Sequence, residues 1–173
     1  MTKRKVMISI ESERQELMRS IFEEAMNEEI PEEDGEFEDS DPIQVLVEGR
    51  LVTNRDRVEL LYDEQDASGM GGSTTAIGFD RTAPGLISMM RTGPVNTTMV
   101  FEEHRRHICV YNTPFSQFEI CTHAIRVDNR ILTEGRLLLD YLIEVRGARA
   151  ERCKMVVTLR SMNETETLIS ALN

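Results

Sequence analysis

The chain has 173 residues, of which 40% are hydrophobic, and its formal net charge is −11. This length and apolar content are typical of one soluble domain with a core of its own, so we treat residues 1–173 as a single domain. No apolar run approaches the roughly 20 residues that cross a bilayer, which argues against membrane contact.

The N-terminal residues and the cysteines indicate the compartment. The basic start, Met1–Lys5, is followed only by the short apolar run Val6–Ile10, which is too short for a signal-peptide core. Three cysteines are an odd number and do not suggest a disulfide framework. We therefore expect a cytoplasmic protein with reduced thiols.

The negative charge is concentrated in one segment. Residues 11–41 contain 14 of the 31 acidic side chains and two of the 20 basic ones, which gives this segment a net charge of −12 and leaves +1 for the remainder. A nearly neutral body does not favour nucleic-acid binding through a broad basic face.

The first 41 residues predict a strand and then a helix. Val6–Ile10 reads as a short first strand. Apolar residues then recur at helical spacing, and Ser12 with Gln15 forms a candidate capping box, so we predict a helix over residues 13–28. Pro31 ends it, and an acidic loop follows to Asp41. The sequence thus predicts an acidic helical insertion at residues 12–41, either a solvated segment or a docking surface for a basic partner.

From Pro42 onward the apolar pattern has a period of two, and turn residues come at short intervals. The predicted strands span Ile43–Thr53, Val58–Tyr62, Ser73–Asp80, Leu86–Arg91, Val95–Phe101, His107–Thr113, Gln117–Val127, Ile131–Val145 and Arg152–Arg160. A short C-terminal helix is predicted from Asn163 to Leu172. Hairpin connections without β–α–β alternation favour an all-β fold, a single antiparallel barrel of about eight to ten strands.

A set of short motifs in the second half resembles a known family. In chain order these are Met90-Arg91-Thr92-Gly93, Met99-Val100-Phe101, Tyr111-Asn112-Thr113-Pro114-Phe115, Thr122, Gly135 and Leu139-Asp140-Tyr141. The chain resembles the YwiB-like family of bacterial proteins over roughly residues 43–160. This family is a domain of unknown function grouped with the calycins, which are lipocalin-like barrels. The resemblance implies a barrel with a central cavity and no known reaction. Ser116 stands where the family usually has Gly, and the acidic insertion has no counterpart in the pattern.

The family pattern supplies the candidate site. The residues that we expect to line the barrel interior are Arg91, Met99, Phe101, Tyr111, Thr113, Thr122 and Tyr141. In a binding site, Arg91 would neutralise an anionic group, the Tyr and Thr hydroxyls would orient it, and the apolar side chains would wall the rest. In a purely structural role, Arg91 would pair with a barrel acid and the hydroxyls would bond to backbone groups. Arg91 can act as a ligand only if its strand points it inward.

A second constellation depends on one assumed strand register. If a hairpin is centred on Phe115, His107 faces His123 and Cys109 faces Cys121, and these donor types suit Zn²⁺. A slip of one residue would change the partners. We prefer two thiols and two imidazoles on one sheet face, with no metal. The nearby run His104–His107 reads as a solvated turn, with phosphate or the acidic segment of a neighbouring copy as alternatives.

Catalytic signatures are missing from the sequence, which has no Gly-x-Ser-x-Gly elbow, no His-Glu-x-x-His and no phosphate-binding glycine loop. We therefore expect a non-enzymatic barrel, with no cofactor, that binds a small, partly apolar and anionic ligand. The alternative is an interaction or assembly module in which the acidic insertion docks a protein partner or a second copy as a homodimer.

Overall fold

The computed structural model describes residues 1–16, 38–39, 41–66, 70–145 and 150–162. Its strands are β1 (Thr2–Glu16), β2 (Glu38–Asp39), β3 (Ile43–Thr53), β4 (Arg57–Asp63), β5 (Thr74–Asp80), β6 (Ala83–Thr92), β7 (Asn96–Glu102), β8 (Arg106–Asn112), β9 (Gln117–Arg130), β10 (Arg136–Val145) and β11 (Ala150–Ser161), and one helical turn, α2 (Ile131–Glu134), lies between β9 and β10.

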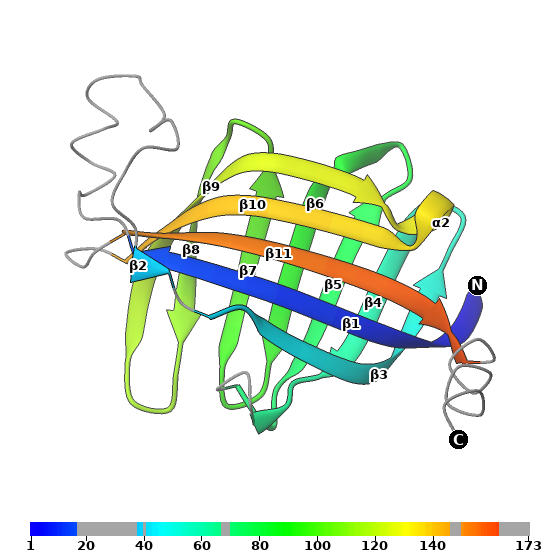
Figure 1. Ribbon diagram of the computed structural model, residues 1–173, viewed down its shortest axis with the longest axis horizontal. Coiled ribbons are helices and arrows are strands. Elements are labelled where there is room, and N and C mark those ends of the chain that lie inside the picture. Colours follow the sequence, from blue (N-terminus) through cyan, green and yellow to red (C-terminus); the bar gives the residue numbers. More distant parts are fainter. Residues whose placement is uncertain (17–37, 40, 67–69, 146–149, 163–173) are drawn as a thin grey trace.

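Ten of these strands form a closed antiparallel barrel (Figure 1). Each strand from β3 to β11 pairs with the next along the chain, and β1 closes the ring between β3 and β11. The two-residue β2 pairs only with the end of β1. Closure removes the free edges that an open sheet would leave. The predicted all-β, antiparallel barrel of about eight to ten strands is confirmed.

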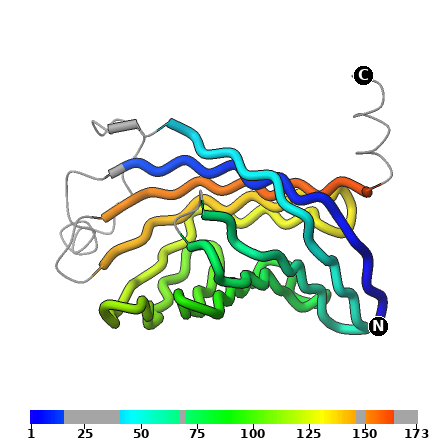
Figure 2. Tube along the Cα trace, turned by 90° about the horizontal axis from the view of Figure 1, so that it is seen from below, coloured from blue at the N-terminus to red at the C-terminus, as the bar shows by residue number. Residues whose placement is uncertain are grey.

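The barrel is flattened into two walls. Viewed from below, β1, β3, β10 and β11 lie along one side and the strands from β5 to β8 along the other (Figure 2). Inward side chains alternate with outward ones along each strand, as the burial of β4 and β6 illustrates. Their apolar members form one hydrophobic cluster that fills the middle of the barrel.

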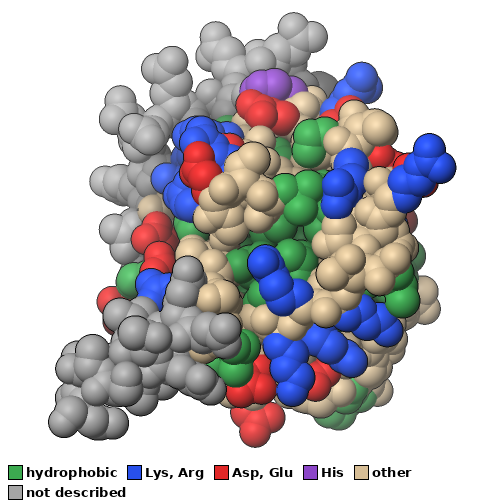
Figure 3. Space-filling view, turned by 90° about the vertical axis from the view of Figure 1, so that its right-hand side faces the viewer, with side chains coloured by type: hydrophobic (Ala, Val, Ile, Leu, Met, Phe, Trp, Pro, Cys, Tyr) green, Lys and Arg blue, Asp and Glu red, His purple; other side chains and the backbone are tan. Residues whose placement is uncertain are grey.

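One end of the barrel is occupied by apolar side chains. Seen from the right-hand side of Figure 1, hydrophobic side chains fill the centre of this face, and Lys and Arg side chains lie around them (Figure 3). The family resemblance implies a central cavity, whereas in the described residues an apolar cluster occupies the middle of the barrel.

The predicted N-terminal helix is wrong where the structure describes it. Ser12 and Gln15, the expected capping box, lie in β1 opposite Met155 and Arg152 of β11. Because β1 has ladder partners on both sides, its pairings outweigh a local helical signal. In the insertion predicted at residues 12–41, residues 12–16 therefore belong to β1 and residues 38–39 form β2. Residues 17–37 lie outside the described residues.

A second correction concerns the segment before β10. The strand predicted at Ile131–Val145 begins only at Arg136, because Ile131–Glu134 forms the helical turn α2. Gly135 ends this turn in a left-handed conformation with φ 66°, which reverses the chain into β10. The turn predicted at residues 128–130 instead belongs to β9. The predicted C-terminal helix, Asn163 to Leu172, lies outside the described residues.

Candidate functional site

Arg91 points into the barrel near the end of β6. It follows the alternation of Ile87 and Met89, which are buried inward residues of the same strand, and it is only 9% exposed. Its Nε lies 3.2 Å from both Oε1 of Glu64 and Oγ1 of Thr75. Arg91 could act as a ligand only if its side chain points inward, and the structure meets this condition.

Glu64 is the counter-charge of Arg91. The side chains of this ion pair are 10% and 6% exposed. Thr75 donates a hydrogen bond from Oγ1 to Oε1 of Glu64 at 2.6 Å. Burial of Tyr62, and then the negative charge of Glu64, raise the pKa of the phenol above its ordinary value, and the positive charge of Arg91 opposes them. Tyr62 therefore stays protonated and can donate a hydrogen bond.

This network lines a small cavity at one mouth of the barrel. The cavity has a volume of about 80 Å³. Its lining residues are Ile10, Ser12, Arg14, Ile43, Val45, Tyr62, Glu64, Met70, Arg91, Tyr141, Cys153, Lys154 and Met155. Because a water molecule takes about 30 Å³ of liquid volume, the cavity has room for a group of a few heavy atoms and not for a whole drug-sized ligand.

The charges around this cavity are unequal. Arg14 and Arg91 bring two positive charges to the lining, and Glu64 brings one negative charge. Arg91 is buried and Arg14 is exposed. Cationic side chains attract anions, so an anion would be favoured in this position.

Two further groups of the cavity are protonated at neutral pH. Burial raises the pKa of the Tyr141 phenol, with the nearby Cys153 adding to the effect. Burial also raises the pKa of the Cys153 thiol to about 11, against the lowering effect of the Arg14 charge. The cavity thus offers hydrogen-bond donors and no thiolate nucleophile.

Only part of the predicted site comes together. Arg91 and Tyr141 both line the mouth cavity. Met99 and Phe101 are 3% and 0% exposed members of the packed core, and the Phe101 ring lies 4.7 Å from that of Tyr141. Tyr111 stacks on Phe118, with ring centroids 5.3 Å apart. Met99, Phe101 and Tyr111 are not among the residues of this cavity.

The two predicted threonines have backbone roles instead. Oγ1 of Thr122 lies 3.0 Å from the carbonyl oxygen of Val100 and is buried. Thr113 lies in the β8–β9 loop, outside the barrel interior, where Oγ1 accepts hydrogen bonds from the N–H groups of Phe115 and Ser116 at 3.3 and 3.0 Å. Its placement in the interior was wrong because the strand ends at Asn112, one residue earlier than predicted.

Several cavity residues were missed from the sequence. Glu64 continues the inward alternation of Leu60 and Tyr62. An acidic residue at a position where this alternation expects an apolar one could have identified it as a site residue. The contributions of Arg14 and Cys153 depend on where β1 and β11 meet, and no local pattern marks that register.

The hypothetical zinc set does not form. In the observed hairpin, His107 faces Thr122 and Cys109 faces Ile120, a slip of one residue from the assumed register. Cys109 therefore packs toward the core, while Cys121 lies on the other face of the sheet. Among the described residues, no group of three or more His, Cys, Asp or Glu side chains is placed to hold a metal ion.

In the described part of the chain, no helix has the length and apolar character needed to cross a membrane.

Comparisons with known proteins agree on the fold. A family model described as Domain of unknown function (DUF1934) matches residues 25–157. The crystal structure of the YwiB protein from Bacillus subtilis superposes with a TM-score of 0.66 at 19% sequence identity, covering 92% of each chain. No curated protein matches the chain. At this identity the structural likeness establishes the barrel fold alone.

Proposed function

The chain belongs to the DUF1934 family of domains of unknown function, and from this premise we propose that its barrel is a non-enzymatic binding module for a small anion, held at the barrel mouth beside Arg91. The single observation that carries the proposal is the buried Arg91, paired with Glu64, at a mouth cavity whose lining also includes Arg14.

The guanidinium of Arg91 has donors left for a ligand. A guanidinium has five N–H groups in a planar fork that matches a carboxylate or phosphate. The contacts of Arg91 with described residues engage Nε and, through the sulfur of Met89 at 3.6 Å, Nη2. Nη1 can therefore donate to an anion in the cavity.

The chemistry of the cavity supports binding rather than catalysis. A catalytic thiol needs a lowered pKa, and that of Cys153 is raised to about 11. Arg91 faces the first residues of β7, whereas His104 and His107 follow its last residue. Neither imidazole can therefore act as a base at the mouth. The free thiols of Cys109, Cys121 and Cys153 also suit the cytoplasmic setting that we propose.

Binding of inorganic phosphate, measured by isothermal titration calorimetry at constant ionic strength, tests the proposal. The key variant is the double substitution Arg91→Met with Glu64→Gln, which removes both charges of the buried pair and leaves neither uncompensated. We expect the wild-type protein to bind phosphate and the double variant to bind it at least tenfold more weakly.

Two control variants make the result specific. Arg57→Met removes an outward arginine whose side chain is 49% exposed, and Thr113→Ala removes a hydroxyl of the β8–β9 loop. Both are expected to keep wild-type affinity within twofold. Equal affinity of the double variant and the wild type, or no binding to the wild type, would refute the anion site.

A second candidate function is assembly through the acidic segment. The observation in its favour is the separation of charge along the chain, with a net −12 over residues 11–41 and +1 elsewhere. Exposed apolar side chains on the β8–β9 hairpin, Ile108 and Phe115, offer a surface that a partner could cover. Oligomer size measured after replacement of residues 17–37 separates this function from the first.

A further inference from the structure

The ladder between β7 and β8 opens after two residue pairs. Asn96 faces Asn112 and Thr97 faces Tyr111, and beyond them no ladder is formed between the described residues of these strands. All other neighbouring strands of the ten-strand ring share at least five pairs. This seam is therefore the weakest part of the barrel wall.

The far end of the seam is held by β9. Thr122 of β9 reaches the carbonyl oxygen of Val100 on β7, and the N–H of His104 donates to the carbonyl oxygen of Ala124 at 2.9 Å. These contacts tie Val100 of β7 and His104, which follows β7, to β9. The opening is thus a defined gap between two anchored ends.

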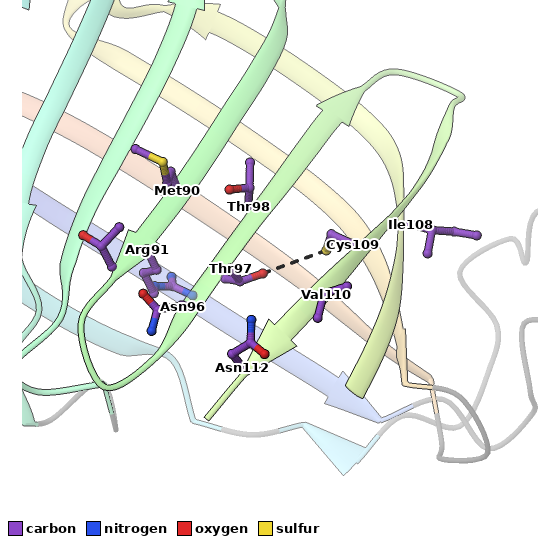
Figure 4. A pocket seen from close by; sticks show the side chains of 10 residues that line it. Met90, Arg91, Asn96, Thr97, Thr98, Ile108, Cys109, Val110 and Asn112 are labelled. Atoms are coloured by element: carbon purple, nitrogen blue, oxygen red, sulfur yellow. Dashed lines mark hydrogen bonds between the residues drawn. The ribbon is translucent and has the colours of Figure 1, made fainter. Parts of the chain in front are cut away.

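A groove of about 550 Å³ occupies the seam, a volume within the range of small-molecule sites. Its described lining residues are Met90, Arg91, Thr92, Asn96, Thr97, Thr98, Ile108, Cys109, Val110 and Asn112 (Figure 4). Both faces of the wall contribute: Arg91 and Thr97 are buried inward residues, while Met90 and Val110 are exposed outward ones. The groove therefore extends into the barrel wall.

The outer part of this groove is apolar. Met90, Ile108 and Val110 are 47%, 69% and 42% exposed. Figure 4 shows Met90 on β6 and Ile108 and Val110 on β8, with β7 between the two strands. Apolar side chains placed around a groove gain free energy when an apolar group covers them.

The inner part of the groove reaches the anion site. Arg91 lines both this groove and the mouth cavity. It is also the one charged residue among the described groove residues, which include no carboxylate. Arg91 is paired with Glu64 on the cavity side but has a further N–H group to donate, so a ligand with one negative end and an uncharged, apolar remainder complements this groove.

We propose that the β7–β8 seam binds the alkyl chain of a small monocarboxylate whose carboxylate reaches Arg91. The inference rests on the proposed anion site and adds the class of its ligand. The alkyl chain lies between β6 and β8 against Met90, Ile108 and Val110, while the carboxylate passes Thr97 and accepts hydrogen bonds from the guanidinium. A central cavity is not needed, since the chain stays in the wall.

A series of carboxylates tests this directly. Dissociation constants for acetate, butyrate, hexanoate and octanoate, measured by calorimetry on the full chain, should fall by two- to fourfold for each added methylene, because each buried methylene contributes a similar increment. Octanol, which has the same chain without the charge, should bind at least tenfold more weakly than octanoate.

The decisive variant is Ile108→Thr with Val110→Thr. Both residues are outward and the replacements keep β-branched side chains, so β8 should retain its strand preference. The double variant should bind acetate with the wild-type dissociation constant. Its affinity should no longer increase from acetate to octanoate. Leu46→Thr, at a 60% exposed apolar residue of β3, is the matched control and should leave the whole series unchanged.

The outcomes separate the two proposals. A flat chain-length series in the wild type, an unchanged series in the Ile108→Thr/Val110→Thr variant, or octanol binding as tightly as octanoate would overturn the seam proposal while phosphate binding at Arg91 could persist. Loss of the anion site itself would appear as phosphate and acetate binding that does not depend on Arg91.

Discussion

Burial decides the protonation of single side chains near the barrel mouth. Arg91 and Glu64 form a buried ion pair, and removing one partner of such a pair costs about 3–5 kcal/mol. Burial raises the pKa of Cys153, Tyr62 and Tyr141, and the nearby arginine charges only partly oppose it. These two phenols and this thiol therefore stay protonated at neutral pH.

These raised pKa values predict a loss of stability at alkaline pH. The pKa of Cys153 rises from its ordinary 9.0 to about 11 on folding. Between these values the folded state binds more protons than the unfolded state, so the free energy of unfolding falls as pH rises. The full contribution is present below pH 9 and is lost above about pH 11, where Tyr62 and Tyr141 act in the same direction.

Urea unfolding between pH 8 and pH 11 measures this effect. Cys153→Ala should lose less stability over this range than the wild type, by on the order of 2 kcal/mol. Cys121→Ala is the control, because Cys121 lies on the outer face of β9 and is less buried. Parallel curves for Cys153→Ala and the wild type would contradict the assignment.

At the scale of single elements, two junctions set where strands begin. β1 continues to Glu16 because β3 and β11 pair with it, although its sequence favours a helix there. β10 begins at Arg136 because α2 and Gly135 reverse the chain. The N–H of Gly135 donates to the carbonyl oxygen of Ile131, and its own carbonyl accepts from Leu159 at 2.7 Å.

Gly135 is predicted to be required for this reversal. A Cβ at this position would lie 3.0 Å from the carbonyl oxygen of Leu159, and φ is +66°. Gly135→Ala should lower the free energy of unfolding by about 1–2 kcal/mol. Gly85→Ala is a matched control, since nothing lies within 4 Å of a Cβ there, and it should change stability by less than about 0.5 kcal/mol. Equal effects of the two variants in a urea titration would rule out this role for Gly135.

At the scale of the whole molecule, the described ladders close the ring without residues 17–37. β1 pairs with β11 over eleven residues and with β3 over another eleven. Glu16 and Glu38 face each other where β1 meets β2. Glu16 and Glu38, which flank residues 17–37, are thus adjacent, so a short loop could connect them.

We predict that replacing residues 17–37 by a short Gly-Asn loop leaves the barrel folded. The described ladders do not involve these residues, so far-ultraviolet circular dichroism and phosphate affinity should match the wild type. Light scattering then tests the assembly function. A smaller particle with intact phosphate binding would support assembly through the segment, whereas an unchanged particle size would argue against it. An unfolded variant would show that the barrel depends on the segment.

The predictability of each part follows from the range of the interactions that form it. Period-two alternation and regular turns predicted β3 with the observed bounds and identified the barrel, because these signals are local. They could not predict the end of β1, where partners distant in sequence decide the conformation. In the candidate site, the sequence left the direction of Arg91 open, and its partner Glu64, which follows β4, is brought to it by the pairing of β4 with β5 and of β5 with β6.

By itself, the sequence determined an all-β antiparallel barrel and the concentration of acid in residues 11–41. Only the tertiary structure decided that Arg91 points inward, that the barrel middle is filled, that the β8–β9 register puts Cys109 and Cys121 on opposite faces, and that the β7–β8 ladder has only two pairs. The reason is physical. Alternation and turn chemistry act over a few neighbouring residues, whereas register and cavity shape result from packing among strands far apart in the chain.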